Sequence, residues 1–202
     1  TYIFGDLERL SPWELAIAAD VYRSMQAAGL RCLNNPAKAM ARVELLASLH
    51  DAGLNPVYVA RADTRPKPPR FPVFLRAEND HREASAELYH DQAELEAALA
   101  RLQSTGTPLR GMLVTEKVSG TYADNLWAKW GTYRIGDQII TEHIAVETMW
   151  LVKIGDHAKV TDAIARDENQ AVATGRFVEE LRPAFALSGI EYGRADHAVV
   201  SG

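Results

Sequence analysis

The stretch LRGMLVTEKV, residues 109–118, decides how the rest of the chain is interpreted. Its apolar run at residues 112–114 predicts a buried β-strand, and the Ser119-Gly120 pair then ends the strand. Glu116, Lys117 and Val118 therefore stand at the end of a core strand. A backbone carbonyl and amide there can pair with an adenine edge, and the Glu116 carboxylate can add an acceptor. The alternative is a solvated strand end.

Two other expected strands also end in charged residues. Residues 71–76, FPVFLR, end at Arg76, and residues 190–196, IEYGRAD, contain Arg194 and Asp196. Because side chains alternate along a strand, Arg194 and Asp196 share one face. We expect these three strand ends to converge on a nucleotide and its metal.

The charged residues fit that hypothesis chemically. Arg76 can bind phosphate oxygens through charge-assisted hydrogen bonds; its alternative is a pair with Glu78 or Asp80. Asp196 offers the hard oxygen that Mg²⁺ prefers, and Arg194 offers a guanidinium for a phosphoryl group. The alternative for these two residues is a surface ion pair.

Composition excludes several classes of protein. The chain has 202 residues, a net charge of -5, and 47% hydrophobic residues, which is ordinary for a globular protein. A nucleic-acid-binding domain would be basic, and no apolar run is long enough to span a membrane. The N-terminal residues do not resemble a signal peptide, and the single Cys32 has no partner for a disulfide. We expect a cytoplasmic protein.

The order of expected elements predicts a mixed α/β chain with segregated sheets, α+β in class. Ser11 and Asp91 are good helix caps, and the proline-rich residues 64–70 mark a boundary. Both ends of the chain look truncated. Helices are expected at 12–28, 36–52, 92–103, 160–166 and 169–187, and strands at 30–33, 56–61, 71–76, 109–118, 126–133, 138–143, 149–154 and 190–196.

In order and spacing, these motifs resemble the ATP-grasp superfamily, which includes glutathione synthetase and D-alanine–D-alanine ligase. The matching pieces are RFPVFLR, DQAELEAALARL, LVTEKV, TYRIGDQIITEHI, MWLVK and GIEYGRAD. The resemblance implies two α/β lobes that hold ATP and Mg²⁺ between them. It divides the chain into an N-terminal segment (1–69), a small lobe (70–118) and an incomplete larger lobe (119–202).

The resemblance also implies roles for single residues. Arg76 stands where many members have a phosphate-binding lysine, and Glu116 to Val118 stand at the adenine hinge. Asp124 matches the ribose-binding carboxylate, and Lys153 supplies a cation. Arg194 then stabilises the transferring phosphoryl group, and Asp196 binds the metal.

Two features depart from the family pattern. Residues 78–85 contain no glycine, whereas many members cover the phosphates with a glycine-rich loop. The Glu-x-Asn metal motif expected on the strand after residue 196 is not in the sequence.

The expected function is an ATP-dependent carboxylate–amine or carboxylate–thiol ligase that works through an acyl phosphate. Its partners would be small-molecule or peptide substrates, without nucleic acid or membrane, and its oligomeric state stays open. A degenerate module that binds nucleotide or a partner without chemistry is one alternative. A small-molecule kinase on the same fold is the other.

Overall fold

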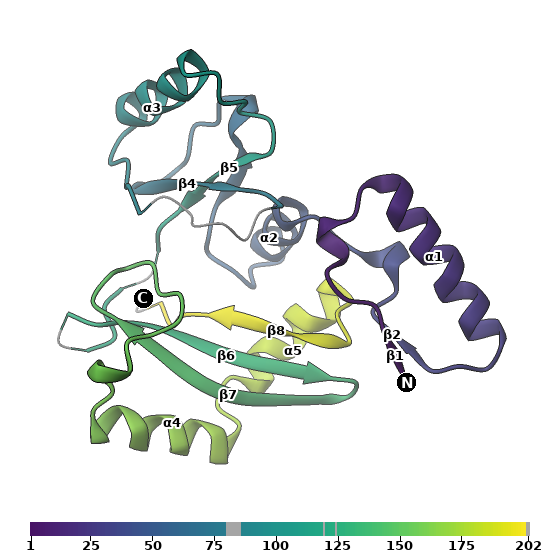
Figure 1. The fold of residues 1–202 in the computed structure, drawn as a ribbon. Helices are drawn as coiled ribbons and strands as arrows, with labels where there is room; N and C mark the ends of the chain where they lie inside the picture. Colours follow the sequence, from purple (N-terminus) through teal and green to yellow (C-terminus); the bar gives the residue numbers. More distant parts are fainter. Residues whose placement is uncertain (80–85, 119, 124, 201–202) are drawn as a thin grey trace. The chain divides into compact units, whose positions relative to one another are not determined.

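The computed structural model describes residues 1–79, 86–118, 120–123 and 125–200. The chain forms two compact units, each assembled from separate stretches of sequence (Figure 1). Unit 1 contains Thr1–Gly5, Trp13–Lys38 and Ser119–Gly202, and unit 2 contains Asp6–Pro12 and Ala39–Val118. The division into segments 1–69, 70–118 and 119–202 stays a prediction, because the compactness of a unit does not show what function its residues have.

Unit 2 is built on a three-stranded antiparallel sheet in the order β3-β5-β4. Its strands are β3 (Val59–Arg61), β4 (Val73–Ala77) and β5 (Met112–Glu116). The buried strand expected in residues 109–118 is β5, and the strand in 71–76 is its neighbour β4. Their pairing confirms that these two sequence motifs share a sheet.

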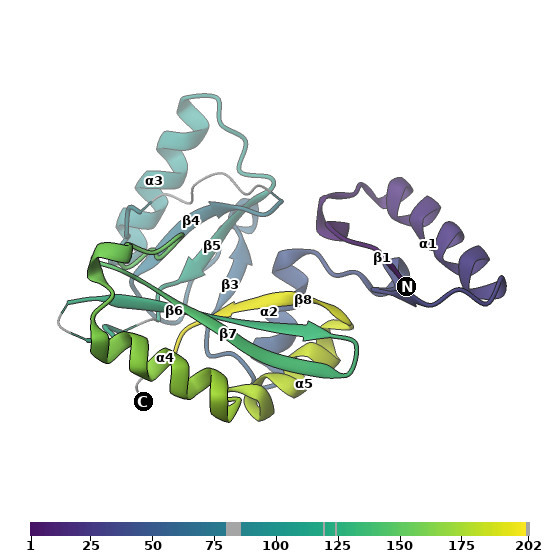
Figure 2. The same cartoon turned by 60° about the horizontal axis from the view of Figure 1, so that its bottom comes forward.

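Helices cover both faces of this sheet. Helix α3 (Gln92–Ser104) packs through Leu95 and Leu99 on the face that holds Val73 and Leu75, and Figure 2 shows it beside β4 and β5. Asp91 caps α3 as expected, because its side chain accepts from the Glu94 amide at 2.9 Å.

Helix α2 packs on the opposite face of the sheet. It spans Arg42–Asp51 and joins Val43 to Val59 and Leu113 in a small core cluster. The helix expected at 36–52 is in fact two pieces, because a separate 3₁₀ turn, η2 (Pro36–Lys38), precedes α2. Unit 2 contains two 3₁₀ turns, η1 (Leu7–Arg9) and η3 (Ala62–Thr64), whereas η2 falls within unit 1.

Unit 1 is built on a second antiparallel sheet, in the order β7-β6-β8. Its strands are β6 (Trp127–Ile135), β7 (Gln138–Glu147) and β8 (Tyr192–His197). The β6–β7 turn falls at Gly136 as expected, with φ of 61°. A bulge interrupts the pair: Gly131 faces His143, but the next residue, Thr132, faces Thr141. One residue of β7 is therefore extra.

Helices α4 (Asp162–Thr174) and α5 (Val178–Ser188) accompany this sheet. Trp130, Ile144 and Val146 form the core on the α4 side, together with Ile164 and Ala171 of α4. The expected break between residues 166 and 169 was wrong. Thr161 caps one continuous helix, which ends where Gly175 adopts the left-handed conformation.

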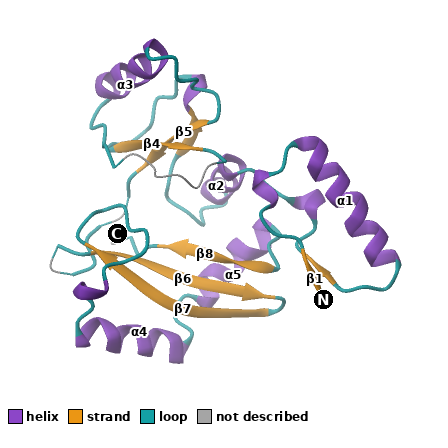
Figure 3. Ribbon diagram, viewed as in Figure 1, coloured by secondary structure: helices purple, strands orange, loops and turns teal. Residues whose placement is uncertain are grey.

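The strand expected at 149–154 was also wrong, since this segment is a loop (Figure 3). The Glu147 carboxylate accepts from the amides of Lys153, Ile154 and Gly155, at 3.0, 3.2 and 2.9 Å. Backbone donors that a strand would pair with a neighbour are thus satisfied by one side chain. The 3₁₀ turn η4 (His157–Lys159) follows.

The remaining part of unit 1 lies near the N-terminus. Strands β1 (Tyr2–Ile3) and β2 (Cys32–Leu33) pair in parallel, and α1 (Pro12–Ala27) connects them. Phe4 meets Tyr22 of α1 edge to face at 5.4 Å. The mixed α+β architecture with small sheets confirms the predicted class. Within the described residues, no helix combines the length and apolarity that crossing a membrane requires.

Candidate functional site

Arg76 lies on the α2 side of the unit 2 sheet, opposite Leu113 of β5. Its Nε atom is buried and has no hydrogen-bond partner among the described residues. Burial disfavours the charged form and Arg42 repels it, which together lower the pKa of Arg76 to about 10. The group is still a cation at neutral pH, and its Nε atom lacks, among the described residues, the acceptor that a buried polar group normally has.

The described neighbours of Arg76 bind to one another instead of to its Nε atom. Glu78, one of the two partners considered for it, instead pairs with Arg61 at 3.1 Å. Arg42, at the start of α2, uses one guanidinium nitrogen for the carbonyls of Ala77 and Glu78, at 3.0 and 2.7 Å. The other partner considered, Asp80, lies outside the described residues. Three guanidinium groups thus lie near this side of the sheet, and the nearby carboxylates of Glu78, Glu44 and Asp63 act on Arg61.

Thr115 adds a second buried polar group to the same face. It pairs with Phe74, two residues from Arg76, so both side chains project to the α2 side. Its hydroxyl is buried and has no partner in the described part of the chain. A hydroxyl donor and a guanidinium donor, both unpaired and adjacent, suit an anion with several oxygens.

The expected adenine hinge is held in place by its own side chain. The Glu116 carboxylate is buried and accepts from Arg70, at 2.9 Å, and from the Tyr58 amide, at 3.0 Å. The Glu116 and Lys117 amides donate to the carbonyls of Tyr58 and Pro72, both at 3.0 Å. The Glu116 side chain thus fixes the end of β5 rather than pointing to a ligand, which the sequence did not predict, and the role of residues 116–118 as an adenine hinge stays a prediction.

A second cluster of charges lies in unit 1, on the face of the β7-β6-β8 sheet away from α4. Arg194 and Asp196 share this face of β8 as expected, with Nε 2.8 Å from the carboxylate. Lys129 of β6 reaches the other Asp196 oxygen at 3.2 Å. Burial alone would lower the pKa of Arg194, but Asp196 and Tyr133 raise it above its ordinary value.

The next residue fixes the end of β8 from the other face. His197 meets Phe177 edge to face at 4.9 Å, and its Nε2 lies 3.0 Å from the Thr132 hydroxyl. Burial lowers the pKa of His197 to about 4, so the imidazole is neutral at pH 7. Asp196 consequently projects from a strand end whose orientation is set by packing rather than by its own ion pairs.

Gly131 leaves room for two side chains of the charged face. A Cβ atom there would lie 2.8 Å from the His143 ring and 3.4 Å from Arg194 Cδ. Arg194 also lies over the Tyr133 ring, with its guanidinium carbon 5.9 Å from the centroid. His143 and Arg194 therefore approach each other above a glycine, where any side chain would separate them.

The two other expected ligand residues have different outcomes. The Lys153 carbonyl accepts from Lys129 at 2.7 Å, which joins the loop after β7 to the Asp196 cluster. The role of the Lys153 ammonium group as a cation stays a prediction. Asp124 lies outside the described residues.

The donor set limits what metal this cluster could hold. Among the described residues no three His, Cys, Asp or Glu side chains gather at one point. Asp196 is the carboxylate of the cluster, and both its oxygens already meet cations. Mg²⁺ commonly binds through one or two carboxylates, with the other ligands from phosphate and water. Asp196 fits that pattern only with a phosphate ligand present.

Sequence reasoning missed Lys129, Thr115 and His143. Lys129 and Gly131 lie two apart in β6, a strand that had been predicted, so alternation could have placed Lys129 on the Gly131 face. Which residue of β8 it meets depends on the register of strands more than 60 residues apart. No local pattern encodes that register.

No family model matches the sequence, and no curated protein matches it. Among solved structures, the chain is similar to an L-amino acid ligase from Bacillus licheniformis, with a TM-score of 0.47 and 15% sequence identity. The match covers 86% of this chain and 40% of the ligase, so the chain spans about two fifths of that enzyme's length. Over most of its length the chain is thus similar in structure to part of an L-amino acid ligase.

Proposed function

We propose that the chain is part of an ATP-dependent ligase that joins a carboxylate to an amine or a thiol. The observation that supports the proposal is that two buried polar atoms on one face of the sheet, Arg76 Nε and the Thr115 hydroxyl, have no hydrogen-bond partner among the described residues. A buried cation without a counter-charge is costly unless a ligand supplies the charge. Nucleotide phosphate oxygens would satisfy both groups.

In this proposal the residues bind, orient and neutralise charge. The Val118 amide reads the adenine edge, and Arg76 with Thr115 binds phosphate oxygens. Arg194 stabilises charge on the transferring phosphoryl group, and Asp196 gives one oxygen to Mg²⁺, which would lower the negative charge of the phosphates when bound. Such catalysis rests on positioning and electrostatics rather than on a covalent nucleophile.

The substrate carboxylate would attack the γ-phosphorus of ATP and displace ADP. The carboxylate and the transferred phosphoryl group would then form an acyl phosphate. The amine or thiol would then attack the acyl carbon and release inorganic phosphate. The kinase alternative, in which an alcohol replaces the carboxylate, uses the same nucleotide residues, so the choice of acceptors in the turnover test separates the two. The unpaired state of Arg76 is compatible with the non-catalytic module as well, so turnover must be measured separately from binding.

The nucleotide test is a calorimetric titration of the full chain with ADP and Mg²⁺. Arg76→Gln should weaken ADP binding by about tenfold or more, the scale of one lost charge-assisted hydrogen bond. Arg110→Gln is the matched control, because Arg110 is exposed. Equal ADP affinity in Arg76→Gln and wild type would contradict the phosphate assignment.

The turnover test measures ADP release with a panel of carboxylate acceptors and amine nucleophiles. Arg194→Ala should lower the rate by about a hundredfold, as expected for loss of a charge-stabilising group. Asp196→Asn should lower turnover far more than it lowers ADP affinity. Wild-type rates in both variants would leave only the surface ion pair, which is worth about 1 kcal/mol or less. Nucleotide binding without any turnover would instead favour the binding module.

A further inference from the structure

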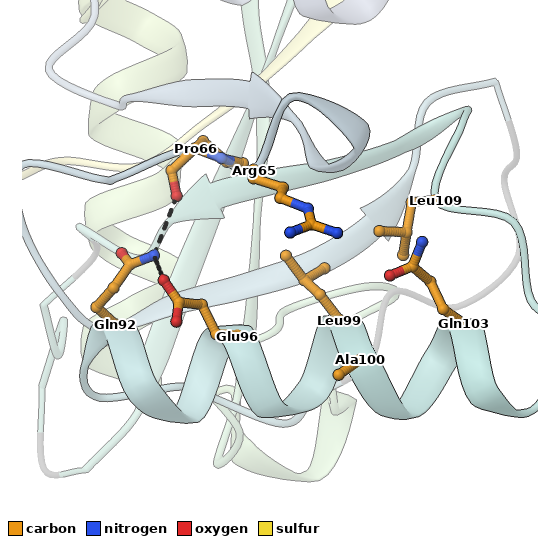
Figure 4. Close-up of a pocket in the computed structure, with 8 residues that line it drawn as sticks. All are labelled: Arg65, Pro66, Gln92, Glu96, Leu99, Ala100, Gln103 and Leu109. Carbon is orange, nitrogen blue, oxygen red and sulfur yellow. Dashed lines mark hydrogen bonds between the residues drawn. The ribbon is translucent and has the colours of Figure 1, made fainter.

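A pocket of about 240 Å³ lies in unit 2 between α3 and the segment that follows η3 (Figure 4). Gln92, Glu96 and Gln103 line it from α3, at spacings that place them along one side of the helix. Leu99 and Leu109, both buried, supply apolar surface to the same pocket. None of these residues belongs to the proposed nucleotide site.

Arg65 supplies the cation of this pocket and is held in a strained conformation. Its φ of 49° and ψ of 60° are left-handed, although Pro66 follows and normally favours extended backbone at this position. The Arg65 amide donates to the Ala62 carbonyl at 3.2 Å. Figure 4 shows the guanidinium above Leu99, and no described acceptor bonds to it. A guanidinium group with no acceptor among the described residues thus lies over an apolar side chain.

Glu96 supplies a carboxylate nearer the start of α3. One of its oxygens accepts from the Gln92 side-chain amide at 2.9 Å, and the same amide lies 3.4 Å from the Pro66 carbonyl. Figure 4 shows this chain of contacts across the pocket mouth, while Arg65 turns toward Leu109 and Gln103. The pocket thus offers a cation and a carboxylate that do not pair with each other, with apolar side chains beside them.

We propose that this pocket binds a free α-amino acid with a small apolar side chain. Arg65 would bind the ligand carboxylate, Glu96 would accept from its ammonium group, and the leucines would contact its side chain. An inorganic anion would leave Glu96 facing a like charge, and an uncharged apolar ligand would leave both charges unused. Because the charged groups are exposed, the affinity should be about millimolar.

The test is a titration of the ¹⁵N-labelled full chain with L-leucine in the absence of nucleotide. The side-chain amides of Gln92 and Gln103 report the pocket directly, and both should shift with one saturating dissociation constant. Two analogues separate the charges: 4-methylpentanoate lacks the ammonium group, and 3-methylbutylamine lacks the carboxylate. Each should bind at least about tenfold more weakly than L-leucine, since each loses one charged contact.

Variants then assign the contacts. Arg65→Gln and Glu96→Gln should each weaken L-leucine binding about tenfold, and Ala100→Trp should block the pocket from its exposed helix position. Lys67→Gln is the matched control, since Lys67 is exposed, lies two residues from Arg65 and does not line the pocket.

The possible results either support or overturn the assignment. L-Leucine shifts that survive Ala100→Trp, or equal binding of L-leucine and its two analogues, would overturn it. So would an absence of shifts up to high millimolar L-leucine in a folded wild-type chain. Because no nucleotide is present, these results are separate from success or failure of the ligase proposal.

Discussion

At the scale of single residues, Asp167 illustrates how one carboxylate can organise its surroundings. It accepts from the Tyr122 hydroxyl at 2.5 Å and from Arg176 at 2.7 Å. The Arg176 guanidinium also lies 5.5 Å from the Trp130 ring centroid. The hydrogen bond from Arg176, followed by that from Tyr122, lowers the pKa of Asp167. Ionised Asp167 therefore joins α4 to the core of the sheet.

The lowered pKa has a defined consequence for stability. The contribution of ionised Asp167 to the free energy of unfolding should be present above the ordinary carboxyl pKa of 3.8. It should be lost as pH falls through the lower pKa of the folded state. Asp167→Asn should lower the free energy of unfolding at pH 7 by about 1–3 kcal/mol. It should also flatten the pH dependence below pH 4. Urea unfolding between pH 7 and pH 3 measures both effects.

The control for Asp167 is Asp137→Asn, which changes an exposed carboxylate in the same unit. A loss at pH 7 that is the same in both variants would show that the Asp167 contacts contribute nothing specific. An unchanged acid limb in Asp167→Asn would contradict the linkage argument.

Residue identity was predictable only where one local pattern sufficed. Arg76 was expected as a strand-end cation, and Arg194 and Asp196 were expected on one face, because each statement needs one strand. Whether Arg76 would pair with Glu78 was not predictable. Glu78, which follows β4, pairs with Arg61 of β3. The two residues meet because β3 and β4 both pair with β5, and this arrangement depends on tertiary structure rather than on local sequence.

At the scale of elements, the loop after β7 depends on a single acceptor. The Glu147 carboxylate satisfies three successive amides, at residues 153–155. Gly155 has φ of 90° and comes close to Ala145, so that end of the loop also requires glycine. The segment therefore behaves as one structural element although it contains no helix or strand.

We expect Glu147→Ala to loosen this loop and leave the sheet in place. Hydrogen exchange at the amides of Lys153, Ile154 and Gly155 should accelerate, because all three lose their acceptor. The free energy of unfolding should fall by about 1–3 kcal/mol. Glu142→Ala, which removes a neighbouring carboxylate bonded to His143, is the control. Unchanged exchange at the three amides would refute the role of Glu147.

Elements were predictable where capping and periodicity agreed. Helix α3 has Asp91 as its cap and a regular apolar face, so both its position and type were correct. Residues 149–154 have an apolar pattern typical of a strand, but the Glu147 side chain takes the amides that strand pairing needs. A competing side-chain acceptor is invisible to a periodicity argument.

At the scale of the whole molecule, Asn34 joins distant parts of unit 1. Its side chain donates to the carbonyls of Phe4 and Tyr192 at 3.0 and 2.8 Å. Its oxygen accepts from the amides of Glu191 and Tyr192 at 2.8 and 2.9 Å. The N-terminal strands and the start of β8 are thereby connected across more than 150 residues of sequence.

Asn34→Gly should destabilise the chain by about 2–4 kcal/mol, because these hydrogen bonds contribute about 1 kcal/mol each. Asn34→Ala should cost about 1 kcal/mol more, since Asn34 has φ of 63° and glycine tolerates that conformation. Denaturant unfolding ranks the two variants. Asn35→Ala, which removes one turn hydrogen bond, is the control. Equal stability of Asn34→Gly and wild type would contradict this argument.

The interleaved construction of the units was not predictable from local sequence. Unit 1 takes its residues from both ends of the chain, and unit 2 takes most of its residues from the middle. Contacts such as those of Asn34 create that division, whereas the proline-rich residues 64–70 marked a boundary only by composition. The α+β class was predictable because it follows from the types and order of the elements alone.

The bulge between β6 and β7 adds one residue to β7 and shifts the alternation of its side chains by one position. Because Glu142 is the extra residue, Thr141 and Ile144 both face the helices, and His143 and Ile140 both face the charged side of the sheet. If Glu142 were removed, Thr141 would still pair with Thr132, and residues 138–141 would keep the faces that they have now. A relative that lacks the extra residue should therefore keep the same apolar pattern in the first half of this strand and show unbroken alternation along its whole length. The register of the hairpin can therefore be deduced from the sequence, once the position of the extra residue is known.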